Sequence, residues 1–324
     1  MWIIIEYLLV IVPIIISVAF VTLAERKVLG SMQIRKGPNV VGIFGILQPI
    51  ADGVKLFAKE TIKPTIANLT IFILSPVLSF LWALILYTVV PVGGYGSAAA
   101  DINLGIIYIL AVSSISVYAI LMSGWSSNSK YAFFGAIRAA AQMISYEVSL
   151  GIIILTIISC VGSYNITNII ESQSTIWFII PMLPVFIMCF VSALAETNRT
   201  PFDLTEGESE LVSGFNVEYS AMSFALFFLA EYSNIIFMSI LLTILFLGGY
   251  LPLFSLTILP PSFWLALKTI VLIYSWIWVR GSLPRMRYDQ LMALIWKSFL
   301  PASLGYLLLV ISLLYWFNGL PFPL

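Results

Sequence analysis

Long apolar runs recur along almost the whole chain and restrict it to one class of fold. Eight runs approach the roughly 20 residues that a helix needs to cross a bilayer, near residues 2–24, 66–91, 102–122, 136–160, 176–195, 219–247, 263–280 and 298–317. Only 9% of the 324 residues are charged, whereas soluble domains carry roughly 25%. The sequence therefore predicts an all-α, polytopic membrane protein with eight transmembrane helices in a single membrane domain, residues 1–324.

A shorter apolar run follows the first expected span. Residues 40–51 include Pro49 and are too few to cross a bilayer. In residues 52–60, Lys55 and Lys59 are interleaved with apolar positions, which is typical of helices that lie in the membrane interface. We expect a short amphipathic interfacial helix here.

The basic residues indicate how the spans are oriented. Every lysine and arginine except Lys268 falls in, or at the edge of, an odd-numbered connection: Arg26, Lys27, Arg35, Lys36, Lys55, Lys59, Lys63, Lys130, Arg138, Arg199, Arg280, Arg285, Arg287 and Lys297. Such an excess marks the cytoplasmic or matrix side of a membrane. We expect both termini on the other side, and we expect Lys268 to extend out of the seventh span along its long stem.

The residue inventory excludes several kinds of site. Histidine is absent, which removes the commonest metal ligand and general base. Cys160 and Cys189 lie in separate apolar runs and cannot supply the roughly four thiolates of an iron–sulfur cluster. We therefore expect no metal site, two buried apolar cysteines, and any redox cofactor in partner chains. The zero net charge gives no indication of nucleic-acid binding.

Carboxylates lie where a lipid environment disfavours them. Glu147 and Glu231 fall inside expected spans, and Glu218 stands at the start of the span that contains Glu231. A charged group at the bilayer centre costs about 2.5–3.5 kcal/mol or more, and burial favours the protonated carboxyl. We interpret these residues as a proton relay. The alternative is a set of structural hydrogen bonds to neighbouring helices.

An acidic segment joins the fifth and sixth expected spans. It contains Glu196, Asp203, Glu206, Glu208 and Glu210, with Arg199 as its cation. The four carboxyls within Asp203–Glu210 lie too close along the chain to ionise independently, so we expect them to share protons. An ordinary solvated acidic loop is the alternative.

Several motifs together resemble one family. They are Ala24–Lys27, Ile34–Asn39, Gln48–Asp52, Gly124–Ser129, Ser145–Val148, Ala195–Tyr219 and Trp278–Gly281. The chain is similar to subunit 1 of respiratory complex I, the proton-pumping NADH:ubiquinone oxidoreductase, from the first span into the eighth. The sequences of residues 32–39 and of the loop around Trp125 resemble those of a mitochondrial, animal member of the family.

The resemblance implies a role in ubiquinone binding. It implies that ubiquinone is the substrate, that flavin and iron–sulfur clusters reside in partner subunits, and that a ubiquinone chamber is lined by Glu25, Arg26, Asp52, Phe224, Phe228 and Arg280. The alternative for the two phenylalanines is a role in helix packing alone, which the sequence leaves open.

The resemblance also implies an acidic channel that couples quinone reduction to proton translocation. Its members would be Glu147, Glu196, Asp203, Glu206, Glu208, Glu210, Glu218 and Glu231. The implied location is the mitochondrial inner membrane, with odd loops facing the matrix and both termini facing the intermembrane space. The implied partners are hydrophilic-arm subunits on the odd loops, small and antiporter-like membrane subunits, and phospholipid. The basic loops can also be read simply as topology signals.

Two other functions compete with this interpretation. A stand-alone proton or cation antiporter is expected to carry an inverted repeat, and the sequence shows none. A structural membrane anchor for a redox arm explains the basic loops but leaves Glu147 and Glu231 without a role.

Overall fold

The protein is described by a computed structural model that covers residues 2–94, 98–203, 214–252, 259–319 and 321, and these residues contain helices and no strand. The all-α prediction is confirmed for them. The α-helices are α1 (Trp2–Met32), α2 (Gln48–Ala58), α3 (Leu69–Ile85), α4 (Gly105–Ser126), α5 (Lys130–Val161), α6 (Ile166–Ser172), α7 (Leu183–Glu196), α9 (Ala221–Phe246), α10 (Pro261–Ser282), α11 (Tyr288–Ala293) and α12 (Leu300–Trp316).

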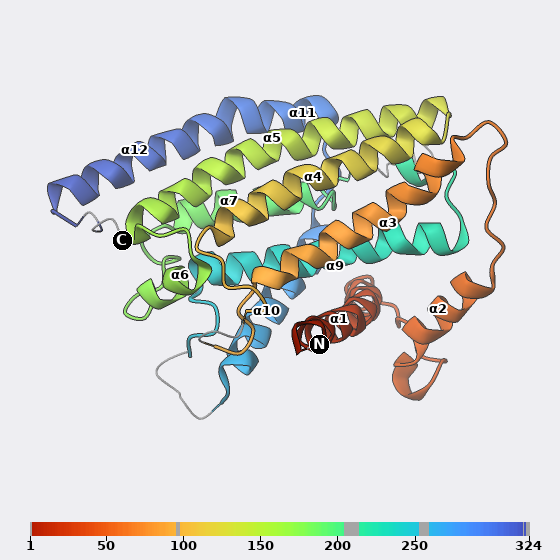
Figure 1. The fold of residues 1–324 in the computed structure, drawn as a ribbon, viewed down its shortest axis with the longest axis horizontal. Coiled ribbons are helices and arrows are strands. Elements are labelled where there is room, and N and C mark those ends of the chain that lie inside the picture. The colour runs from red at the N-terminus through yellow and green to blue at the C-terminus, as the bar shows by residue number, and fades with distance from the viewer. Residues whose placement is uncertain (1, 95–97, 204–213, 253–258, 320, 322–324) are drawn as a thin grey trace.

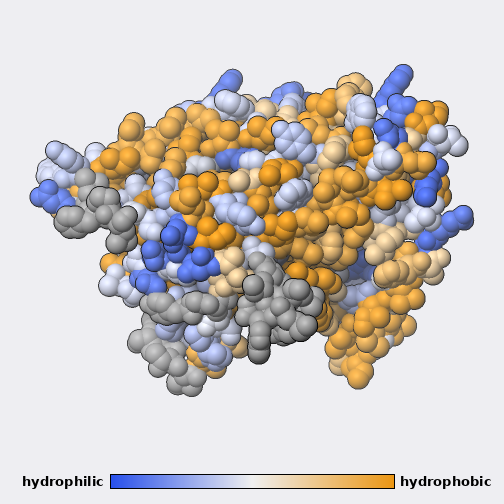
Figure 2. All heavy atoms as spheres, viewed as in Figure 1, coloured by the Kyte–Doolittle hydropathy of each residue, from blue (hydrophilic) through white to orange (hydrophobic). Residues whose placement is uncertain are grey.

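Six helical segments within the described residues are long and apolar enough to cross a membrane. They are Leu69–Val89, Gly105–Ser126, Lys130–Val161, Ala221–Phe246, Pro261–Ser282 and Tyr288–Trp316. Apolar side chains cover most of the face of the molecule in Figure 2. In water such an apolar surface would promote aggregation, whereas in a bilayer it can face the lipid chains directly.

Helix α9 lies at the centre of the bundle. It packs against α1, α3, α7 and α10, while α5 packs against α4, α7 and α12 (Figure 1). In the most apolar 18-residue stretch of α9, 67% of the residues are buried, whereas in that of Tyr288–Trp316 only 6% are buried. Side chains on α9 can therefore contact several other elements, which makes this helix the natural support for a buried site.

Helix α7 is shorter than the sequence predicted. The expected span began near residue 176, but the helix begins at Leu183 and has 14 residues. Prolines explain the difference, because Pro184 lies in its first turn and Pro181 precedes it. Proline is favoured at a helix start and interrupts a helix interior.

The last span is longer than predicted. Its expected start was residue 298, but the helical segment runs from Tyr288 and passes through a π-helical turn at Leu294–Phe299. Pro301 follows this turn. Since proline has no N–H to donate, wider hydrogen bonding in the preceding turn accommodates it.

Helix α2 begins earlier than expected. The amphipathic helix was predicted over residues 52–60, and the structure has it over Gln48–Ala58, with Pro49 in the first turn. None of its residues is buried. Figure 1 shows α2 beside the bundle rather than within it.

The expected position of Lys268 is wrong. Its side chain is buried, and its Nζ donates to the carbonyls of Leu247, Gly249 and Leu251 at 2.6, 3.0 and 2.7 Å. The carbonyls at a helix C-terminus lack partners within the helix. Lys268 donates hydrogen bonds to the carbonyls that follow the end of α9. It therefore connects the end of α9 to α10 instead of extending out of the bundle.

We expect Lys268→Met to destabilise this end of the bundle. The substitution leaves buried carbonyls without a donor, at a cost of roughly 1–3 kcal/mol. The melting temperature of the purified protein should therefore fall. Lys297→Met is the matched control because Lys297 is exposed, and an equal loss in both variants would contradict the capping role.

Candidate functional site

A large cavity opens between α1, α2 and the first turns of α9. Its volume is about 630 Å³, within the range of small-molecule sites. Arg26, Asp52, Phe224 and Phe228, four of the six residues expected to line a chamber, lie in its wall. The rings of Phe224 and Phe228 have centroids 4.4 Å apart. The wall is mostly apolar with charges at one side, a composition suited to an amphipathic ligand.

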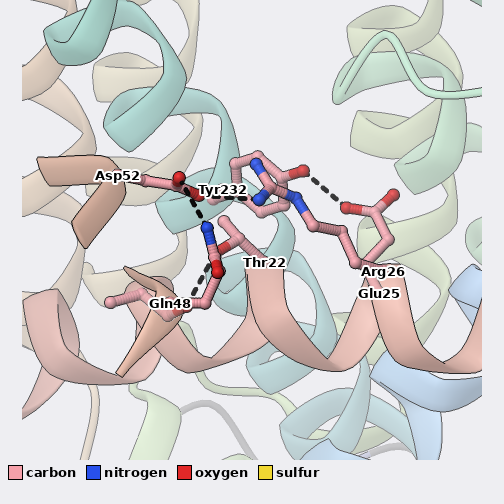
Figure 3. A network of polar contacts seen from close by, with 7 residues as sticks. Thr22, Glu25, Arg26, Gln48, Asp52 and Tyr232 are labelled. Carbon is pink, nitrogen blue, oxygen red and sulfur yellow. Dashed lines mark hydrogen bonds and ion pairs between the residues drawn. The ribbon is translucent and has the colours of Figure 1, made fainter. Parts of the chain in front are cut away.

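The side of the large cavity formed by α2 is held by polar contacts. Arg26 donates to Asp52 at 2.6 Å, and the Gln48 amide donates to the same carboxylate at 3.0 Å (Figure 3). The side chains of Arg26 and Asp52 are 53% and 36% exposed. Exposed ion pairs contribute about 0–1 kcal/mol, so α2 is held weakly.

A charged cluster borders the large cavity. It consists of Glu25 from α1, Arg199 from the segment after α7, Tyr232 from α9 and Arg280 from α10. Tyr232 donates to Glu25 at 2.5 Å, Arg199 Nη1 lies 3.3 Å from Glu25 Oε1, and Arg280 pairs with the same oxygen. Tyr232 also lines the large cavity. The two remaining expected chamber residues, Glu25 and Arg280, thus lie next to that cavity rather than in its wall.

Glu25 is the shared anion of the charged cluster. Its side chain is 8% exposed, and it pairs with both Arg199 and Arg280 and accepts a hydrogen bond from Tyr232. Opposite charges and hydrogen bonds to a carboxylate favour its charged form. We therefore expect Glu25 to act as a fixed negative charge rather than as a proton carrier.

A second, smaller cavity brings two of the expected relay residues together. Glu196 and Glu231 line a space of about 40 Å³, with Ser116, Asn198 and Asn234 among its other walls. We call this space the carboxylate cavity. The Oδ1 atoms of Asn198 and Asn234 are buried without a partner among the described residues. A water needs roughly 10–15 Å³ and two to four polar partners, so the carboxylate cavity can hold a few waters.

Glu147 lies on the outer side of this arrangement. It accepts hydrogen bonds from Ser113 at 2.9 Å and Ser114 at 2.6 Å, and it is close enough to Glu196 to interact electrostatically. Ile144 and Val148, which flank it on α5, are 52% and 45% exposed. Glu147, Glu196 and Glu231 therefore form a series that runs from the surface of the bundle towards Arg199.

The other expected relay residues lie elsewhere. Asp203 pairs with Arg285 at 3.3 Å, in the connection after α10. Glu218 is half-buried and is not among the described residues that line either cavity. Glu206, Glu208 and Glu210 lie outside the described residues, so their predicted proton sharing stays a prediction.

Two members of the charged cluster are not predicted from the sequence. Tyr232 stands next to Glu231 in the chain, and Arg199 is identifiable there only as the cation of the acidic segment. The guanidinium carbon of Arg199 lies 4.3 Å from the centre of the Tyr232 ring. A lone arginine after an apolar helix was the available signal, because a buried arginine requires an anion to pair with.

Comparison with known proteins places the fold in a family. The family model described as NADH dehydrogenase matches residues 5–311. The chain belongs to this NADH dehydrogenase family. The match covers α1 through most of α12, and so all the elements that build the two cavities and the charged cluster.

Full-length relatives support the NADH dehydrogenase assignment. A protein of Metridium senile named NADH-ubiquinone oxidoreductase chain 1 is 64% identical over 320 residues, covering 98% of this chain and 95% of its own. The chain 1 protein of Chondrus crispus is 58% identical, with 98% of both chains covered. A bacterial relative, an NADH-quinone oxidoreductase protein of Paramagnetospirillum magneticum, is 53% identical, covering 98% of this chain and 94% of its own.

Proposed function

We propose that this chain is a core membrane subunit of a proton-pumping NADH:quinone oxidoreductase. In this proposal the large cavity admits ubiquinone as substrate, and the nearby carboxylates couple its reduction to proton translocation. The observation that carries the proposal is the series of large cavity, charged cluster and carboxylate cavity, joined through Tyr232, Arg199 and Glu231. Flavin and iron–sulfur clusters would reside in partner subunits.

The chemistry of the large cavity supports quinone as its ligand. A quinone has a polar head and a long apolar tail, and α2 leaves Ile50, Val54 and Phe57 between 62% and 73% exposed. If α2 lies in the membrane interface, such a tail can pass beneath it from lipid. The charged residues Arg26 and Asp52 would then meet the head, and Phe224 and Phe228 would flank its path.

We further propose eight membrane crossings. The two beyond the six long apolar segments would be α1, whose 31 residues extend about 46 Å at 1.5 Å per residue, and α7 with the turn before it. The one-sided basic residues would then put the odd loops on the matrix side of the mitochondrial inner membrane and both termini in the intermembrane space.

We also propose an animal source for the chain, which its identity of 64% to the Metridium senile protein supports.

Partner subunits are expected on two surfaces. The basic odd loops would receive the hydrophilic-arm subunits that contain the redox centres, with phospholipid around them. The face of α4 and α5 that carries Glu147 would receive small and antiporter-like membrane subunits. The half-buried carboxylate of Glu147 would be unfavourable in contact with lipid. The exposed apolar side chains of Ile144 and Val148 beside it could pack against a helix of a partner subunit. Asp203, Glu206, Glu208, Glu210 and Glu218 would complete the acidic channel.

A test of this function is the substitution Phe228→Ala in the assembled enzyme. Loss of the ring from the wall of the large cavity should raise the KM for a short-chain ubiquinone roughly tenfold, about 1.4 kcal/mol of binding. Phe263→Ala is the control because Phe263 is 45% exposed at the start of α10. An unchanged KM in Phe228→Ala would argue against quinone in this cavity.

A further inference from the structure

Tyr219 joins the wall of the large cavity to two neighbouring helices. It precedes α9 and lines the cavity together with the first turns of that helix. Its hydroxyl shares hydrogen bonds with Ser75 on α3 at 2.9 Å and with Ser126 at the end of α4 at 3.3 Å. We propose that Tyr219 is a positioning residue that holds the start of α9 in the conformation that binds quinone. This inference rests on the proposed function.

The ring of Tyr219 is fixed as firmly as its hydroxyl. It stacks on Phe72 of α3, with ring centroids 4.1 Å apart and planes within 4° of each other. The edge of Phe227 on α9 approaches it at 5.0 Å, and the three buried side chains belong to one apolar cluster. Both arrangements are favourable geometries for aromatic pairs. The side chain therefore has one position, and the backbone that carries it is held there too.

The backbone after Tyr219 needs this support. Ala221 opens α9 with a φ of 53°, in the left-handed region that residues with a Cβ atom rarely adopt. Ala221 is buried and also lines the large cavity. A strained conformation persists only where surrounding contacts determine it, and such residues are frequent at ligand sites. The anchored Tyr219 side chain provides these contacts on the side of α3 and α4.

Ser220 fastens the same turn on the side of α2. Its Oγ accepts a hydrogen bond at 2.9 Å from the backbone N–H of Ile62, in the segment after α2. Ser220 and Lys59, the residue that ends α2, both line the large cavity. Figure 1 shows this segment passing the start of α9 on its way from α2 to α3. A turn that relaxes at residues 219–221 would therefore displace two borders of the cavity at once.

The matched variants are Tyr219→Phe and Tyr87→Phe in the assembled enzyme. Each removes one hydroxyl from a buried tyrosine, but Tyr87, which donates to the carbonyl of Ser233 at 2.6 Å, is not among the described residues that line either cavity. We expect Tyr219→Phe to raise the KM for decylubiquinone about fivefold, with kcat within about twofold of wild type. Tyr87→Phe should lower the melting temperature and keep the wild-type KM. An unchanged KM in Tyr219→Phe, or an equal rise in both variants, would overturn the proposal.

A suppressor variant separates positioning of the turn from direct contact between the hydroxyl and quinone. Glycine adopts the left-handed conformation without steric cost, so Ala221→Gly should preserve the turn even when the Tyr219 hydroxyl is absent. The double variant Tyr219→Phe with Ala221→Gly should therefore recover a KM within about twofold of wild type. A KM that stays at the value of Tyr219→Phe would show that the hydroxyl does not act through the turn, which would overturn the inference.

Ser220→Ala covers the case in which Tyr219→Phe fails to assemble. It removes the acceptor of the Ile62 N–H and so releases the same turn from the side of α2. We expect a rise in the KM for decylubiquinone of about threefold, and a wild-type KM would overturn the inference. Failure of the proposed function would look different, because Phe228→Ala would then leave the KM unchanged as well.

Discussion

Replacing Glu25 by glutamine is expected to lower quinone reductase activity of the assembled enzyme at least tenfold. The change leaves Arg199 and Arg280 in the charged cluster without their shared carboxylate. Removing one partner from a buried ion pair costs about 3–5 kcal/mol. We expect the lower end of that range, because the Arg280 side chain is 35% exposed and water screens it. The measurement is inhibitor-sensitive activity per assembled complex, together with the melting temperature.

Asp52→Asn is the matched control for Glu25→Gln. It also removes a carboxylate from an arginine beside the large cavity, but its ion pair with Arg26 is exposed. We expect a stability change below about 1 kcal/mol. If Glu25→Gln and Asp52→Asn lower stability equally, burial of the charged cluster would not be the cause of the loss in Glu25→Gln.

The Glu25→Gln defect should not depend on pH near neutrality. A carboxylate that pairs with two arginines is favoured in its charged form. The difference between wild type and Glu25→Gln should therefore be constant between about pH 6 and 8. A defect that disappears within that window would show that Glu25 titrates there.

Replacing Glu231 or Glu196 by glutamine is expected to reduce proton pumping at least tenfold while the complex still assembles. Glutamine keeps the size of the side chain and can still form hydrogen bonds, but it cannot carry a proton. The two carboxyls line the same cavity, so each variant should interrupt the same path. The double variant should then be no worse than either single variant, since residues that act as a unit are not additive.

Glu171→Gln provides the control for the relay variants. Glu171 lies on α6, in a different helix from either relay residue, and we expect wild-type pumping from it. Pumping is measured in liposomes as protons moved per electron pair. Strict additivity of Glu196→Gln and Glu231→Gln would indicate two separate paths instead of one.

The sequence predicted the helical class because hydrophobicity alone decides it. The helix limits were less predictable where prolines intervene: Pro184 delays the start of α7, and the turn before Pro301 widens so that the last span begins at Tyr288. The start of α5 at Lys130 was missed because Ser129 and Lys130 are polar. An apolar run identifies the lipid-facing part of a helix, not the polar turns that extend it.

The members of the site were easier to predict than their pairing. Carboxylates inside apolar runs, such as Glu147 and Glu231, are conspicuous because lipid disfavours them. Their neighbours are set by tertiary packing: Arg199 meets a carboxylate 174 positions away in the chain. The role of Lys268 was unpredictable for the same reason. Its partners are carbonyls of the turn after α9, and their positions depend on the tertiary fold.

We propose that carboxyls beside the charged cluster exchange protons when quinone is reduced. This exchange is tested most directly by the infrared difference spectrum between the oxidised and reduced states of the assembled enzyme. We expect a carboxylic acid C=O signal in the wild type that is lost in both Glu196→Gln and Glu231→Gln. Identical difference spectra for the wild type and both variants would contradict it.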